Sequence, residues 1–202
     1  HLCEGPAAYI LAGEPESGIM RLAHGEIPQG VTKSDAIMDL DTLPFPRWDL
    51  VSEGPRRSIA AKWLTRPVGG GYPLLASRGC PEFCTYCPHR ILAGHRERSV
   101  LSIVEELEYI CERYPNPYII FRDPLFTQDR ARCLALADEI VAFVQTLGLR
   151  KPMIVGFSDG GQVALEIGMR YPALPQLIAI GGTLFKFSDS YRAFVRNAVG
   201  SE

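Results

Sequence analysis

The stretch SVLSIVEELEYICERYPNPYIIFRD, residues 99–123, decides the expected fold of this chain. Its first part carries an apolar stripe at helical spacing, formed by Val100, Ile103, Leu107, Ile110 and Tyr114. The stripe predicts an amphipathic helix over residues 99–114, which the prolines at 115 and 117 end. Residues 118–121 are wholly apolar, which is typical of a parallel strand covered on both faces. Helix and strand in alternation predict an α/β fold.

Further elements extend this pattern in both directions. Ser102 and Glu105 form a possible capping box for the first helix, and Ser99 is an equally good cap. Residues 74–77 predict a short strand before this helix. A second helix is expected at about 128–147, with Thr127 as its N-cap and a stop at Gly148.

Composition limits the class of protein. The 202 residues are 47% apolar and 22% charged, which indicates one or two globular domains. The net charge of −2 and the lack of a long apolar run predict neither a nucleic-acid partner nor a membrane partner. Six cysteines, three of them clustered, favour a reducing compartment, so we expect a cytoplasmic protein. Because the chain starts at His1 without a leader, we expect it to be a piece of something longer.

The cysteine cluster CPEFCTYC, residues 80–87, is the clearest candidate for chemistry. Cys80, Cys84 and Cys87 follow a C-x3-C-x2-C spacing, and thiolates in such a group select iron–sulfur clusters or zinc. A structural zinc site needs four ligands, so three thiolates leave one metal position open. Two alternatives remain: zinc with His89 as the fourth ligand, or thiols without a metal.

This spacing, with Tyr86 before the last cysteine, resembles the cluster loop of radical S-adenosylmethionine (SAM) enzymes. The resemblance implies a 4Fe–4S cluster on Cys80, Cys84 and Cys87, with SAM on the open iron and Tyr86 beside its adenine. It also implies a 5′-deoxyadenosyl radical, an external electron donor and a small-molecule substrate that the sequence does not specify.

Two polar residues near the cluster are further candidates for binding SAM or substrate. Arg78 precedes the cysteine loop, and Asp123 ends a strand on the side where the loop lies. Asp123 is equally well placed to cap the next turn. The other cations around the loop are expected to form a solvated basic turn; they are Arg90, His95, Arg96 and Arg98.

Residues 1–73 are rich in turn formers and predict a connector, with one strand at 7–12 and a short helix at 16–23. The segments GEPE at 13–16 and DLDTLPFPRWD at 39–49 resemble the junction of cobalamin-binding radical SAM proteins. Cobalamin is not expected in this chain, because the Asp-x-His-x-x-Gly signature is absent. The three glycines at 69–71 are expected to be linker.

The last quarter of the chain carries a different sequence pattern from the segments before it. Residues 152–156 predict a strand, 162–171 a helix and 177–180 a buried strand. Between the first two, Gly156-Phe-Ser158-Asp-Gly160 resembles the nucleophile elbow of α/β-hydrolases, with Ser158 as the nucleophile. No histidine follows Ser158 to act as its base. We expect a join between two ancestries near residues 146–152.

The overall expectation is an α/β protein with about four parallel strands, forming a partial radical SAM barrel and a hydrolase-like βαβ unit. Its divisions are a linker-like segment (1–73), a partial radical SAM domain (74–148) and a hydrolase-like fragment (149–202). The expected function is 4Fe–4S and SAM binding for radical chemistry, incomplete as an enzyme. The alternatives are a serine hydrolase acting through Ser158 and an inactive hybrid.

Overall fold

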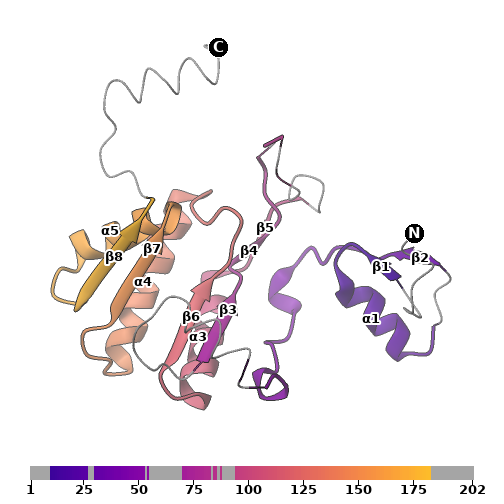
Figure 1. Ribbon diagram of the computed structural model, residues 1–202, viewed down its shortest axis with the longest axis horizontal. Coiled ribbons are helices and arrows are strands. Elements are labelled where there is room, and N and C mark those ends of the chain that lie inside the picture. The colour runs from indigo at the N-terminus through magenta and orange to yellow at the C-terminus, as the bar shows by residue number, and fades with distance from the viewer. Residues whose placement is uncertain are drawn as a thin grey trace, which may run out of the picture. The chain divides into compact units, whose positions relative to one another are not determined.

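A computed structural model describes residues 10–26, 30–52, 54, 70–82, 84–85, 87 and 94–182. These residues form an α/β structure with four α-helices and four two-stranded sheets, three of them parallel, and they close no barrel (Figure 1). The predicted α/β class is therefore confirmed. The chain divides into two compact units, residues 1–125 and 126–202, which are described separately. No finding tests the boundaries of the three divisions expected from sequence, after residues 73 and 148, and these boundaries stay predictions.

The first unit begins with a small parallel βαβ arrangement. It consists of β1 (Ile10–Ala12), α1 (Pro15–Ala23) and β2 (Val31–Lys33). Gly18 of α1 is buried and leaves no room for a larger residue, because an added Cβ would lie 2.8 Å from the Leu11 side chain. Its N–H donates to Ser34 Oγ at 3.0 Å. The expected connector therefore contains a folded element, and two 3₁₀ helices follow it, Leu40–Thr42 and Trp48–Leu50.

A second parallel βαβ arrangement forms the core of this unit. It consists of β3 (Gly70–Leu74), α3 (Val100–Arg113) and β6 (Pro117–Phe121). The register places Gly70 opposite Pro117 and Leu74 opposite Phe121. Tyr72, at the centre of β3, stacks on Tyr114 with ring centroids 5.0 Å apart and is 1% exposed. The helix predicted at 99–114 is thus confirmed, with its buried side facing a packed interior.

A short antiparallel pair interrupts the crossover between β3 and α3. The strands are β4 (Ser77–Arg78) and β5 (Arg96–Glu97), and Ser77 pairs with Glu97. Residues 79–95, which include the cysteine cluster, connect these two strands. The pair therefore anchors both ends of the cysteine loop to the first unit.

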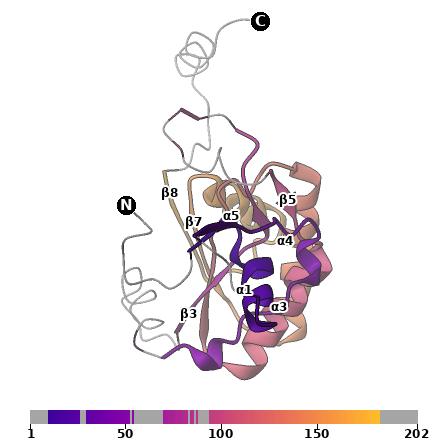
Figure 2. The same ribbon diagram turned by 90° about the vertical axis from the view of Figure 1, so that its right-hand side faces the viewer.

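The second unit contains α4 (Arg130–Thr146), β7 (Met153–Phe157), α5 (Asp159–Arg170) and β8 (Leu177–Gly181). Figures 1 and 2 show β7 and β8 side by side in parallel, and Met153 pairs with Leu177. Ala137 and Val141 of α4 and Ile167 of α5 form one buried apolar cluster, and Ile154 of β7 packs against it. The other side of the sheet is different: Val155 is 54% exposed and Phe157 is 75% exposed.

Several local expectations are wrong in detail. Gly70 and Gly71 are not linker but the buried start of β3, because their partners in β6 lie far along the chain. The strand expected at 74–77 is divided by a bend into the end of β3 and the start of β4. The strand expected to be buried at 177–180 has Leu177 53% exposed.

The helix caps can be compared one by one. Ser99 is the N-cap of α3, since its side chain accepts from the Ser102 N–H at 3.1 Å. Asp129, and not Thr127, caps α4 by accepting from the Arg132 N–H at 3.0 Å. Gly148 follows α4 with a φ of 63°, which confirms the predicted stop.

No helix in the described ranges is both long enough and apolar enough to cross a membrane. The expected cytoplasmic location stays a prediction.

Candidate functional site at the carboxyl ends of β3 and β6

The carboxyl ends of β3 and β6 lie together because the two strands are parallel and in register. Leu74 pairs with Phe121, and the Arg122 N–H donates to Leu74 O at 2.9 Å, which extends the ladder by one step. Beyond this point the chain bends at residues 75–76 on one side and reaches Asp123 on the other. In open parallel sheets, ligands bind at this end of the strands.

The Asp123 carboxylate joins the two strand ends. Its Oδ2 accepts from the Ala76 N–H at 3.1 Å, and its Oδ1 accepts from the Ser77 hydroxyl at 2.6 Å. Ser77 is 1% exposed, so the second bond is held in the interior, whereas Asp123 itself is only half-buried. The sequence predicted Asp123 at the end of a strand, on the side of the cysteine loop. The structure shows in addition that Asp123 binds Ser77, the residue that precedes Arg78.

A buried ion pair supports the same bend. The Arg98 guanidinium binds the Glu106 carboxylate of α3, and their side chains are 11% and 4% exposed. The Arg98 guanidinium also donates to Leu75 O at 3.2 Å, and the backbone N–H of Arg98 donates to Ala76 O at 2.9 Å. The bend therefore rests on charged groups that are themselves paired, as buried charges require.

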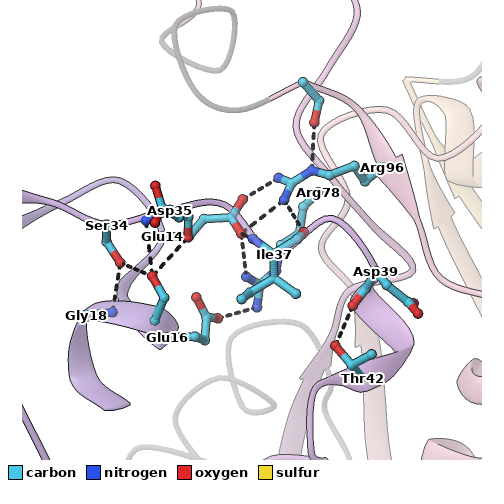
Figure 3. Close-up of polar contacts among 12 residues, drawn as sticks. Glu14, Glu16, Gly18, Ser34, Asp35, Ile37, Asp39, Thr42, Arg78 and Arg96 are labelled. Atoms are coloured by element: carbon cyan, nitrogen blue, oxygen red, sulfur yellow. Dashed lines mark hydrogen bonds and ion pairs between the residues drawn. The ribbon is translucent and has the colours of Figure 1, made fainter. Parts of the chain in front are cut away.

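Arg78 is held by carboxylates of the N-terminal βαβ arrangement (Figure 3). Its guanidinium lies 3.2 Å from Glu14 and 2.7 Å from Glu16. Arg96, 6% exposed in its side chain, also binds Glu14 and donates to Ile37 O at 2.5 Å. The expectation of a solvated basic turn is therefore wrong for Arg96. It is also wrong for Arg98, because both guanidinium groups are buried against carboxylates.

These contacts set the titration of Glu14. Hydrogen bonds from Arg96 lower the pKa of Glu14 below its usual value, an effect larger than the opposing effect of burial. A folded-state pKa below the unfolded one stabilises the fold above the unfolded pKa. That contribution is lost as the pH falls through the folded pKa.

The cysteine loop does not form the expected metal site. Cys84 is exposed and Cys80 and Cys87 are half-buried, and none of the five described cysteines forms a disulfide. Within the described ranges, no group of three or more His, Cys, Asp and Glu side chains is placed to hold a metal ion. Metal ligands must converge on one point, and these donors do not. Tyr86 and His89 lie outside the described residues.

Ser158 lies in a sharp turn between β7 and α5, as the glycine spacing predicts. Its φ and ψ of 53° and −120° are a conformation that L-residues rarely adopt, and its N–H donates to Gly181 O at 2.8 Å. The close approach of strand and helix needs Gly156, because a Cβ there would meet Gly160 O at 2.2 Å. The second unit contains no histidine in its sequence, so a base for Ser158 would have to come from elsewhere.

Two carboxylates of the first unit were not foreseen as site residues. Glu106 carried a signal, because it lies three residues after Ile103 and four before Ile110, inside the apolar stripe of α3. An acidic residue in a buried stripe predicts a buried cationic partner. Glu14 carried no such signal, since its partner Arg96 is 82 residues away.

Comparison with known proteins adds one finding. The chain is 29% identical over 131 residues to an uncharacterized methyltransferase of Pyrococcus horikoshii, a match that covers 62% of this chain and 26% of that protein. The chain thus spans about a quarter of the length of the curated relative it matches. No family model and no solved structure matches it.

The match and the geometry together correct the expected identity and function. The relative is named a methyltransferase, and the described cysteines do not gather into a site for an iron–sulfur cluster. The predicted radical SAM segment joined to an α/β-hydrolase segment, with radical chemistry or serine hydrolysis, is therefore wrong. No finding tests the roles predicted for single residues, including Arg78, Asp123 and Ser158, and these stay predictions.

Proposed function

We propose that this chain contributes to a SAM-dependent methyltransferase, as the part that binds SAM. The observation that carries the proposal is the similarity over 131 residues to a protein named a methyltransferase. The chain's α/β architecture is compatible with it, because a parallel strand pair presents polar groups at its carboxyl ends.

Asp123 is the residue that we assign to the cofactor. SAM carries ribose hydroxyls and an amino group, all of them hydrogen-bond donors, and a carboxylate is an acceptor. The Asp123 carboxylate is half-buried and is held by Ala76 and Ser77, so it meets a ligand at this edge without having to be ordered first. Such preorganisation favours binding.

Arg78 is assigned a supporting role. Its guanidinium is bound by Glu14 and Glu16, and it follows directly after Ser77. This ion-pair cluster holds β4 next to the bend and so helps to keep the Ser77 hydroxyl on Asp123. The assignment differs from direct contact with the cofactor, which the sequence predicted for Arg78.

Bound SAM supplies an electrophilic methyl group on a sulfonium, which a substrate nucleophile takes as the carbon–sulfur bond breaks and S-adenosylhomocysteine leaves. This chain's own contribution is to bind and orient that donor. The substrate and the groups that recognise it belong to the whole protein.

Equilibrium dialysis of the full chain with radiolabelled SAM tests the proposal. We expect saturable binding that S-adenosylhomocysteine competes away. The Asp123→Asn variant should bind about 10–100-fold more weakly, because a hydrogen bond to a charged group contributes about 1.5–3 kcal/mol. Asp138→Asn is the matched control in the second unit, where the carboxylate is bound by Arg170 and Tyr171.

Two outcomes would contradict the proposal. One is the absence of saturable SAM binding by the wild-type chain. The other is an Asp123→Asn variant whose affinity equals that of Asp138→Asn while both keep the wild-type circular dichroism spectrum.

A further inference from the structure

We propose that Glu14 is a positioning residue for the candidate site, which it acts on from the β1–α1–β2 arrangement by holding Arg78 and Arg96 together. The two arginines belong to β4 and β5, and β4 also carries Ser77, which binds Asp123. The proposal rests on the proposed SAM binding for its functional test. Its structural test depends on the ion-pair geometry alone.

The first observation is that Arg78 and Arg96 lie directly opposite each other. The register of β4 and β5 pairs them across the two antiparallel strands. Residues opposed in this way have Cβ atoms about 4.5–5.5 Å apart, and like charges there are destabilising. Each strand is only 2 residues long, and a two-stranded pair is marginally stable by itself. The pair therefore needs a group that offsets the repulsion.

The second observation is that one carboxylate binds both guanidinium groups (Figure 3). Glu14 Oε2 accepts from Arg78 at 3.2 Å and from Arg96 at 3.1 Å, and Oε1 binds Arg96 a second time. The Ile37 N–H also donates to Oε2, at 3.3 Å, which helps to fix the direction of the carboxylate. Hydrogen bonds from Arg96 lower the pKa of Glu14, so this bridge is negatively charged at neutral pH.

The third observation is that the bridge is shielded from solvent. The side chains of Arg96, Glu14 and Arg78 are 6%, 17% and 26% exposed. Glu16 binds Arg78 as well, but among the described residues the carboxylate that neutralises Arg96 is that of Glu14. Removal of one partner from a buried ion pair leaves an uncompensated charge, which is more costly than removal of both partners. Arg96 therefore depends on Glu14.

The bridge reaches the candidate site through Ser77, the neighbour of Arg78 in β4. The Ser77 hydroxyl donates to the Asp123 carboxylate at 2.6 Å, and the Ala76 N–H donates to the same carboxylate at 3.1 Å. If β4 separates from β5, Ser77 moves and Asp123 loses a donor. Because coupling between two sites is reciprocal, a ligand on Asp123 should in turn stabilise the bridge.

Hydrogen exchange of the full chain, measured by mass spectrometry, tests the structural part. In Glu14→Gln, exchange over residues 76–78 and 96–98 should be about 10–100-fold faster, because hydrogen bonds to a charged group are lost. Glu26→Gln is the matched control, since it removes the same charge from an exposed pair with Arg21. It should leave both segments at the wild-type rate. Glu14→Gln at the wild-type rate would overturn the proposal.

A second substitution separates charge repulsion from a general loss of packing. Arg96→Met in the Glu14→Gln background removes the uncompensated buried charge, so exchange over residues 76–78 should return toward the wild-type rate. If Glu14 acted only by packing, the double variant would lose two contacts and exchange faster than Glu14→Gln. That result would overturn the proposal.

Equilibrium dialysis with radiolabelled SAM tests the functional part. Glu14→Gln should weaken SAM binding, by less than Asp123→Asn because Glu14 acts through Ser77, and Arg96→Met should restore part of the loss. Saturating SAM should slow exchange over residues 10–23 of the wild-type chain. If the wild-type chain binds no SAM, the proposed function fails, and the exchange rates alone decide whether Glu14 holds β4. If it binds SAM and Glu14→Gln binds equally well, Glu14 is not a positioning residue.

Discussion

Two parallel βαβ arrangements in this chain share a topology but differ in how their strands are covered. In β3–α3–β6, four of the five residues of β3 are buried, and Tyr72 is almost inaccessible. In β7–α5–β8, only Gly156 of β7 is buried, and alternate residues such as Val155 and Phe157 are largely exposed. Their topology alone therefore does not determine how much apolar surface they bury.

A short apolar run in the sequence does not determine how deeply its strand is buried. Residues 118–121 and 177–180 look alike in sequence, since both are short, apolar and preceded by a helix. Burial of a strand depends on what packs on each face, which is a tertiary property. One face of β7–β8 has its cover in α4 and α5, whereas Met153, Val155 and Phe157 stay exposed among the described residues.

The largest expected effect separates the two arrangements at their aromatic residues. Tyr72→Ala should lower the free energy of unfolding of the first unit by about 3–5 kcal/mol, because it leaves a cavity beside Tyr114 and Trp48. Phe157→Ala should change the stability of the second unit by less than about 0.5 kcal/mol, since the ring is 75% exposed. Hydrogen exchange by mass spectrometry reports each unit separately. Equal losses of protection would contradict the contrast in burial.

A similar contrast is expected between two ion pairs. Glu106→Ala should cost the first unit about 3–5 kcal/mol, because Arg98 is left buried without its carboxylate. Asp138→Ala should cost the second unit about 0–1 kcal/mol, since its pair with Arg170 is more than a third exposed. Urea unfolding followed by the same exchange measurement checks both. If Glu106→Ala lowers the free energy of unfolding as little as Asp138→Ala does, water solvates Arg98 in place of the carboxylate and the prediction is wrong.

The smallest expected effect tests the covered side of the second unit. Gly156→Ala should destabilise it by about 1–3 kcal/mol, because the new Cβ would lie 2.2 Å from Gly160 O and 2.7 Å from Gly161 Cα. Gly160→Ala is the control, since a Cβ there meets nothing within 4 Å, and it should stabilise α5 by up to about 1 kcal/mol. If the two variants unfold at the same urea concentration, the strand and helix are not in close contact.

Local signals predicted much of the second half of the fold. The apolar stripe of α3, its cap at Ser99 and the stop at Gly148 all follow from short-range chemistry, and each is present. The start of β3 could not be predicted in the same way. Gly70 and Gly71 read as linker until their partners in β6, 47 residues further along, are known.

For the candidate site, too, local signals were predictable from the sequence and long-range contacts were not. Asp123 was predicted because a polar residue after a strand has a defined place in a parallel sheet. Its bonds to Ala76 and Ser77 depend on a bend that no local pattern indicates. The cysteine spacing shows the opposite limit: a motif can be clear in sequence while the thiols do not converge on one point.

The bond between Glu14 and Arg96 has a consequence for the order of folding. It closes a loop of 82 residues, whereas β3–α3–β6 contains a helix that can form locally. Long loops lose more chain entropy on closure, and contacts between distant residues form slowly. We therefore expect the β1–α1–β2 segment to join the first unit late in folding, after the β3–α3–β6 core has formed. Arg78 at the end of β4 and Arg96 at the start of β5 would then already be in place to bind Glu14.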